Sequence, residues 1–436
     1  MNIIKTINFT TLNLIPKFVA QQRNKKTPMF RSLKYRNFKL FFYGQSISLI
    51  GTWMQKTAVS WLVYRLTDSA MLLGLVAFVS LIPSLILSPY AGSLIDRNNK
   101  YKILLVTQVI SMMQAGALAA IIFFKYYNIP IIIGLSLVQG IINAFDVTCR
   151  QSLMVEMVED KADLPNAIAL NSTMANLARI LGPAIAGVIL STFGEDFCFV
   201  GNFVSYIPVL ICLLMMKLNL TVIPHDQKSI WAELEDGFKY ISGDKDLSSM
   251  IVMIGISSLF VIPFNTLMPI FAKDLFHGNA GTFSWFESAA GLGSVAAAMY
   301  LANLKSAKPL MKITIIASAV FGLSLILLSY SSVLTIALVF MTLSGLGMMA
   351  QTSAINTYIQ THAIPEMRGR AISYYVMAYQ GMIPIGSLLI GWGAHAFGPR
   401  LAVCIAGLIG LLATGLFLLY QTKRSGRPIM RLMFKL

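Results

Sequence analysis

The chain has 436 residues, of which 56% are hydrophobic and only 12% are charged. A soluble domain carries about a quarter charged residues, so this composition is that of a membrane protein. The formal net charge of +16 is compatible with a nucleic-acid partner, but the basic residues fall between apolar runs rather than on a polar surface, which excludes that class. The cysteines and histidines show no ligand spacing, so neither a disulfide framework, a metal site nor a cofactor is predicted.

Residues 1–36 are predicted to form a basic cytoplasmic tail. Its first part, residues 1–28, has no acidic residue, and Lys5 and Lys17 interrupt its apolar positions. It is too polar for the core of a signal peptide. We therefore expect residues 1–28 to be disordered, or an extension upstream of the functional chain, and not a membrane span.

The body of the chain consists of apolar runs of membrane-spanning length. A spanning helix needs roughly 20 mostly apolar residues, because no backbone group can stay unpaired in lipid. Such runs lie at 37–64, 70–95, 102–124, 129–150, 166–190, 197–217, 247–270, 281–303, 309–330, 333–357, 369–393 and 399–420. The sequence predicts an all-α integral membrane protein with twelve transmembrane helices.

The longest polar segment, 218–246, separates two six-helix bundles, 37–217 and 247–420, and a basic cytoplasmic tail follows at 421–436. "GPAIAG" and "GSLLIG" occur at corresponding places in the two halves, so we expect the two bundles to be pseudo-symmetric. The polar segment spaces Ile230, Leu234, Phe238 and Ile241 at three to four residues. This predicts an amphipathic helix on the cytoplasmic membrane surface, with a solvated linker as the alternative.

The distribution of lysine and arginine predicts that both termini are cytoplasmic. Most of the 34 basic residues fall in the tails and in one set of alternating loops, whereas the other loops hold only Arg65, Lys125, Lys273 and Arg400. Cytoplasmic loops carry the excess of basic residues, so the second set faces outward.

The loop "GSLIDRNNKYK" carries a resemblance to a known family. G-x-L-x-D-R followed by basic residues resembles the loop motif of the major facilitator superfamily, and it fits at Gly92, Leu94, Asp96, Arg97, Lys100 and Lys102. "NAFDVTCRQSLMVEMV" and "DLPNAIALNSTMANLARILGPAIAG" resemble the branch of enterobactin exporters and macrolide efflux proteins. The resemblance implies an alternating-access secondary transporter that exports a small organic molecule, driven by protons.

This loop is predicted to be a gate that closes when the cytoplasmic ends of the helices meet. Asp96 can face the positive N-terminus of the helix that opens at Gly369. Arg97 and Lys100 need an anionic partner, for which Asp146 is the candidate. The missing side chain of Gly92 would allow two helices to approach closely. Simple positive-inside anchoring is the alternative for the lysines of the loop, Lys100 and Lys102.

Three further charges fall within predicted spans, where charge is costly and usually functional: Lys56, Arg179 and Glu287. Glu287 is the predicted proton carrier, because a carboxylate in a poorly solvated cavity can exchange protons near neutral pH. Lys56 and Arg179 are predicted to bind substrate, which favours an anionic or polyhydroxylated molecule such as a siderophore over a cationic drug. The alternative for Lys56 and Glu287 is that their side chains extend to the membrane interface. The alternative for Arg179 is a structural role, bonded to polar groups of neighbouring helices.

Polar and aromatic residues on the helices that face the centre complete the predicted binding site. They are Trp53, Gln55, Gln139, Asn143, Asn265, Gln351, Tyr379 and Gln380, with packing between helices as the alternative for each. We expect a monomeric antiporter in the inner (cytoplasmic) membrane whose partners are the bilayer, a small organic substrate and the proton. Multidrug efflux, import of a metabolite or lipid, and a membrane-embedded enzyme remain alternatives.

Overall fold

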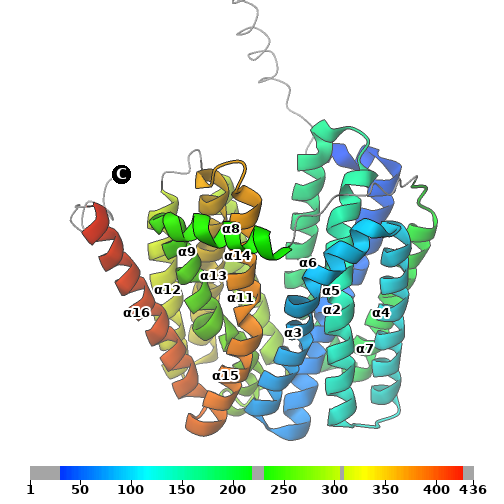
Figure 1. Cartoon of the computed structure of the whole chain (residues 1–436). Helices are drawn as coiled ribbons and strands as arrows, with labels where there is room; N and C mark the ends of the chain where they lie inside the picture. The colour runs from blue at the N-terminus through cyan, green and yellow to red at the C-terminus, as the bar shows by residue number, and fades with distance from the viewer. Residues whose placement is uncertain (1–29, 219–229, 305–308, 426–436) are drawn as a thin grey trace, which may run out of the picture.

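The computed structural model describes residues 30–218, 230–304 and 309–425, and in these ranges the chain is helical throughout (Figure 1). The first half contains α2 (Arg36–Thr67), α3 (Ala70–Arg97), α4 (Lys100–Phe123), α5 (Ile129–Met157), α6 (Leu164–Thr192) and α7 (Glu195–Leu214). The second half contains α9 (Lys245–Ile256), α11 (Ala280–Ala302), α12 (Leu310–Tyr330), α13 (Leu334–His362), α14 (Arg368–Gln380), α15 (Met382–Phe397) and α16 (Pro399–Ser425). The predicted tail segment 1–28 lies outside the described residues.

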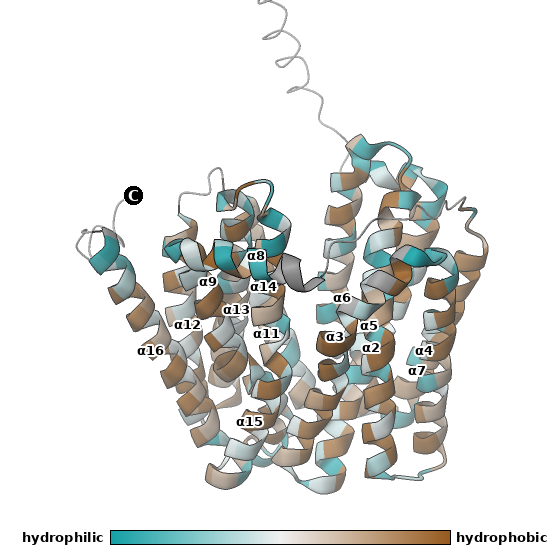
Figure 2. Cartoon of the chain, viewed as in Figure 1, coloured by the Kyte–Doolittle hydropathy of each residue, from teal (hydrophilic) through white to brown (hydrophobic). Residues whose placement is uncertain are grey.

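Every predicted span overlaps a helix of the structure, so the all-helical membrane fold is confirmed. Nine segments of the described chain are long and apolar enough to cross a bilayer. Figure 2 shows the apolar residues along the bodies of these helices and the polar ones at their ends. Side chains in the short loops cap the helices that follow them. The Asn99 side chain accepts a hydrogen bond from the backbone N–H of Lys102 (3.1 Å), and the Asn128 side chain accepts one from the backbone N–H of Ile131 (3.2 Å).

The seventh span is irregular. After α9 the chain passes through a π-helical turn, η3 (Ser257–Val261), a 3₁₀ segment, η4 (Ile262–Leu267), one α-turn, α10 (Met268–Ile270), and a second π-helical turn, η5 (Phe271–Leu275). Pro263 and Pro269 lie within it. Proline has no N–H to donate, so a regular α-helical ladder cannot run through these positions.

Glycines at corresponding places in the two halves let helices cross closely. A Cβ atom on Gly140 of α5 would lie 2.7 Å from the carbonyl oxygen of Ser80 on α3, and one on Gly345 of α13 would lie 2.0 Å from that of Ala290 on α11. Any larger residue would push these helix pairs apart. The repeated crossing supports the pseudo-symmetry expected from the sequence.

The apolar cores show that the two halves meet at one end only. One core combines residues of both halves, including Leu62, Phe199, Phe264 and Phe321. Two other cores belong to a single half each, one around Phe38, Leu104 and Leu153 and the other around Leu247, Ile313 and Ile355. We call the end with the shared core the closed end. The opposite end, which carries α8 (Ile230–Gly243), is the open end (Figure 1).

The predicted amphipathic helix forms as α8 (Ile230–Gly243) and packs on the second half. Asp236 pairs with Arg370 of α14 at 3.2 Å. Ile241 is buried, whereas Phe238 is 61% exposed. Of the predicted apolar face, Phe238 therefore remains available for contact outside the protein.

Candidate functional site

The three charges within the spans lie together between the two halves. Lys56 is on α2, Arg179 is near the middle of α6, and Glu287 is on α11 in the other half. Lys56 and Glu287 interact electrostatically with each other, and each interacts with Arg179. The fold thus brings together charges that are more than a hundred residues apart in sequence.

Two charged groups of this cluster, Glu287 and Lys56, each have a neighbour that orients them. Asn265, on the irregular η4, donates its amide to the Glu287 carboxylate at 2.6 Å. The Lys56 ammonium lies 4.7 Å from the centre of the Trp53 ring, a cation–π contact. Because Asn265 lies where the helix is irregular, bending of that segment would move the partner of Glu287.

The cluster keeps an unneutralised positive charge. One lysine and one arginine face one glutamate, and within the described residues none of the three forms a direct salt bridge. Lys56 is exposed, and Arg179 and Glu287 are half-buried. A small anion can therefore reach both basic groups without displacing an existing ion pair.

The other predicted binding residues divide into three groups. Tyr379 is half-buried and interacts electrostatically with Arg179, so it joins the cluster along with Trp53 and Asn265. Gln139 and Asn143 are half-buried and Gln380 is exposed, with no described contact to the three charges.

Gln55 and Gln351 turn away from the cluster into the interior of their own halves. The Gln55 amide oxygen accepts from Asn202 at 2.7 Å and its NH₂ donates to Gln114 at 3.4 Å. Gln351 is fully buried and donates to Ser257 at 2.6 Å. Both amides satisfy buried polar groups between neighbouring helices, which is the packing alternative named for them above.

The gate predicted for the Gly92–Lys102 loop is not assembled in this conformation. Asp146 accepts from Gln108 at 2.6 Å and pairs with Arg150 at 2.8 Å. Arg97 is exposed, and a Cβ atom on Gly92 would meet nothing within 4 Å. The side chain of Asp96 is outside the described residues. The pairing of Arg97 with Asp146 stays a prediction for the conformation in which the open end closes.

Lys100, the remaining basic member of the predicted gate, lies 3.9 Å from Glu156 of α5. Gly369 lies in the first turn of α14, and a Cβ atom there would meet nothing within 4 Å. Lys100 thus pairs within its own half in this conformation, and there is open space beside Gly369.

Polar pairs across the closed end were missed by the sequence analysis. Lys273 of the second half pairs with Asp68 of the first at 2.5 Å, and the Tyr64 hydroxyl donates to Asp274. The rings of Trp61 and Phe283 stack 6.3 Å apart. Lys273 was counted only as a basic residue of an outward loop, and no local pattern connects it to Asp68.

Comparison with known proteins agrees with this geometry. The family described as transmembrane secretion effector, a branch of the major facilitator superfamily, matches residues 27–426. The chain belongs to this family. It is therefore a secondary transporter of small molecules and not an enzyme.

Relatives and solved structures extend the comparison. The chain is 28% identical to the staphyloferrin A transporter of Staphylococcus aureus, over 88% of this chain and 96% of the relative. It is 24% identical to macrolide efflux protein A of Streptococcus pyogenes, over 86% and 96%. A bacterial homologue of the iron transporter ferroportin in an inward-facing state shares the fold, with a TM-score of 0.68, 13% identity and coverage of 89% and 99%. The nucleoside transporter NupG does so with a TM-score of 0.66, 12% identity and coverage of 88% and 98%.

Proposed function

We propose that this transporter exports a small anionic or polyhydroxylated organic molecule, of the siderophore type, from the cell. The observation that carries the proposal is the unneutralised pair Lys56 and Arg179 between the halves, beside the Trp53 ring. Two basic groups within the membrane-spanning body favour an anion over a cation. Relatives named as a staphyloferrin A transporter and a macrolide efflux protein support export of an organic molecule.

We further propose that the open end faces the cytoplasm of a cell whose inner membrane holds the protein. The basic residues of the loops lie mainly at the end of the bundle that carries α8, in accordance with the positive-inside rule. The conformation described is then inward-facing, with the binding cluster accessible from the side on which an exported substrate is loaded.

Proton coupling through Glu287 is the third element of the proposal. Glu287 is a carboxylate held between the halves, within electrostatic range of both basic groups. Protonation would raise the net positive charge of the cluster and strengthen anion binding, whereas deprotonation would weaken it. By this electrostatic linkage alone the proton and the anion favour each other, so exchange of protons for substrate requires that the proton affinity of Glu287 also change when the conformation changes.

The test is to delete the gene and identify by mass spectrometry the small molecules that accumulate in the cells. We expect anionic or polyhydroxylated compounds, and accumulation of cationic compounds alone would contradict the proposal. With the purified protein, Lys56→Gln should weaken binding of the accumulated compound about tenfold, because one charged hydrogen bond is lost. Lys39→Gln is the control, because Lys39 is an exposed lysine near the start of the same helix.

A further inference from the structure

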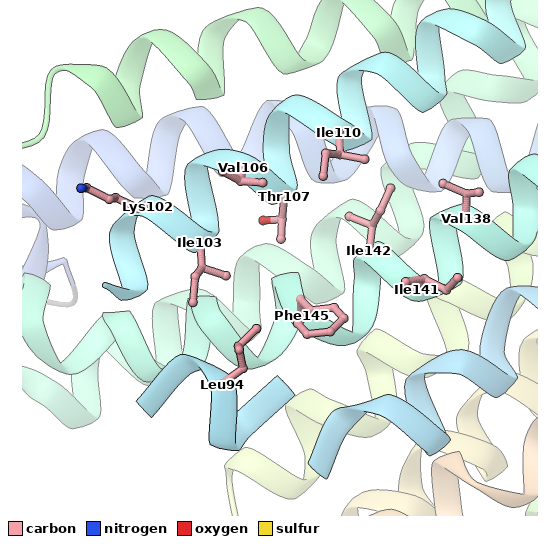
Figure 3. Close-up of a pocket in the computed structure, with 10 residues that line it drawn as sticks. All are labelled: Leu94, Lys102, Ile103, Val106, Thr107, Ile110, Val138, Ile141, Ile142 and Phe145. Carbon is pink, nitrogen blue, oxygen red and sulfur yellow. The ribbon is translucent and has the colours of Figure 1, made fainter. Parts of the chain in front are cut away.

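An apolar groove on the outer surface of the first half has no role in the transport site. It has a volume of about 460 Å³ and lies between α4 and α5, with the end of α3 on its third side (Figure 3). Its lining consists of Leu94, Lys102, Ile103, Val106, Thr107, Ile110, Val138, Ile141, Ile142 and Phe145. We propose that this groove binds an acyl chain of an anionic glycerophospholipid, whose phosphate is held by Lys102.

The position of the groove places it against the bilayer. α4 packs on α5, α7 and α3 and lies at the outer edge of the molecule, away from the second half (Figure 1). From Lys102 to Ile110 the groove extends over eight residues, about 12 Å of helix. That length is close to the half-thickness of a bilayer core of about 30 Å, so the groove occupies the depth of one leaflet.

The chemistry of the lining selects an acyl chain. The hydroxyl of Thr107 is already engaged with the carbonyl oxygen of Leu104 at 2.8 Å and faces Asp146 at 3.4 Å. A water-soluble ligand would therefore find no free polar partner below Lys102. A transmembrane helix is also disfavoured, because helices associate in membranes through small residues and the lining contains no Gly, Ala or Ser.

A basic group marks the end of the groove where the lipid phosphate would lie. Lys102 is exposed at the first turn of α4, and Arg97 is exposed one turn beyond the lining residue Leu94. Neither forms an ion pair with another side chain in the parts of the chain that the structure describes. Lys100 differs, since it lies 3.9 Å from Glu156. Unpaired basic groups beside a membrane-facing groove attract the phosphate of an anionic lipid.

The second half supplies a matched control for this site. Lys312 is the third residue of α12, as Lys102 is the third residue of α4, and the two helices hold corresponding places in the two halves. Lys312 does not line the groove. Substituting either lysine removes one charge from the same position of a helix, so only a specific site distinguishes the two variants.

Native mass spectrometry of the delipidated full-length protein measures the binding of two lipids, phosphatidylglycerol and phosphatidylcholine. The two lipids carry the same acyl chains. We expect phosphatidylglycerol to bind the parent more tightly than phosphatidylcholine does. Lys102→Gln should weaken phosphatidylglycerol binding about fivefold, the contribution of one basic residue near an anionic headgroup, and Lys312→Gln should leave it unchanged. Ile141→Trp, which fills the groove, should weaken binding of both lipids.

Three results would overturn the proposal. The first is equal binding of phosphatidylglycerol to the parent and to Lys102→Gln. The second is a loss of binding in Lys312→Gln as large as the loss in Lys102→Gln. The third is displacement of the lipid by soluble glycerol phosphate at equal concentration. The last result would assign the site to a free phosphate rather than to a lipid. If Ile141→Trp does not fold, the comparison of the two lysine variants, both at accessible positions, still decides the matter.

Discussion

At the scale of single residues, the contact between Asn265 and Glu287 is the most informative feature of the site. The carboxylate lies within the membrane-spanning body, and its hydrogen-bond partner comes from a different helix of the same half. A carboxylate held in this way is stabilised in one geometry and loses its partner when η4 moves. Under the proposed proton coupling, its affinity for a proton would then change with conformation.

Glu287→Gln should abolish uphill transport and leave downhill exchange of substrate in place. The amide keeps the size of the side chain but cannot exchange a proton, and exchange without accumulation needs no proton. Proteoliposomes with an imposed pH gradient measure both activities in the same preparation, so downhill exchange serves as the control for folding. If the variant concentrates substrate as the parent does, Glu287 is not the proton carrier.

The positions of the candidate residues relative to the cluster were only partly predictable from the sequence. Lys56, Arg179 and Glu287 could be selected because a charge within an apolar run is costly wherever it points. Uncharged residues such as Gln55 and Gln351 carry no such signal. Successive helical residues point in directions about 100° apart, so the uncertainty of a residue or two in a helix boundary decides whether an amide faces the centre or the interior of its own half.

At the scale of elements, the contact of α3 with α15 holds the closed end together. A Cβ atom on Gly391 would lie 2.8 Å from the carbonyl oxygen of Ala70 and 3.0 Å from the Cα atom of Gly74. Only glycine permits this approach of the two helices. The pair Lys273 and Asp68 adds a polar contact between the halves at the same end.

Gly391→Leu should therefore force the closed end apart and shift the population toward a conformation in which that end is open. We expect labelling of a cysteine introduced at Phe283, whose ring stacks on Trp61, to increase several-fold, since overpacking of a tight contact costs about 1–3 kcal/mol. Gly393→Leu is the control, because a Cβ atom at Gly393 meets nothing within 4 Å. Equal labelling of the two variants would contradict this role of the α3–α15 contact.

The elements themselves were predictable, whereas their contacts were not. Every predicted span overlaps a helix because lipid imposes length and apolarity on a spanning segment. The closed-end pair joins residues 205 positions apart, and no local period encodes such a distance. The irregular seventh span was indicated only by its two prolines, which mark a break without specifying the π and 3₁₀ turns.

At the scale of the whole molecule, the described part of the chain begins close to the start of the family match. The Asp163 carboxylate forms ion pairs with Arg31 at 2.9 Å and with Lys34 at 2.8 Å. It also accepts a hydrogen bond from the Tyr35 hydroxyl at 2.9 Å. These contacts fasten the segment before α2 to the start of α6. All of them lie after Met29.

A chain that begins at Met29 should insert and transport like the full chain, because it retains every contact of Asp163. A chain that begins at Arg36 loses all three partners of Asp163 and the buried side chains of Ser32 and Tyr35, so its Tm should be lower than that of the full chain. Transport assays and the Tm of the two purified proteins provide the measurement. Loss of insertion in the longer form, or an unchanged Tm in the shorter one, would contradict the prediction.

The core that both halves share at the closed end should also make the equilibrium between the transporter's two conformations depend on temperature. Opening that end brings Trp61, Phe283 and their apolar neighbours into contact with water, and hydration of apolar surface raises the heat capacity. The equilibrium between the two conformations should then give a curved van't Hoff plot instead of a straight line. Because apolar association weakens on cooling, cold alone should make the closed end easier to open, with neither substrate nor proton supplying the driving force.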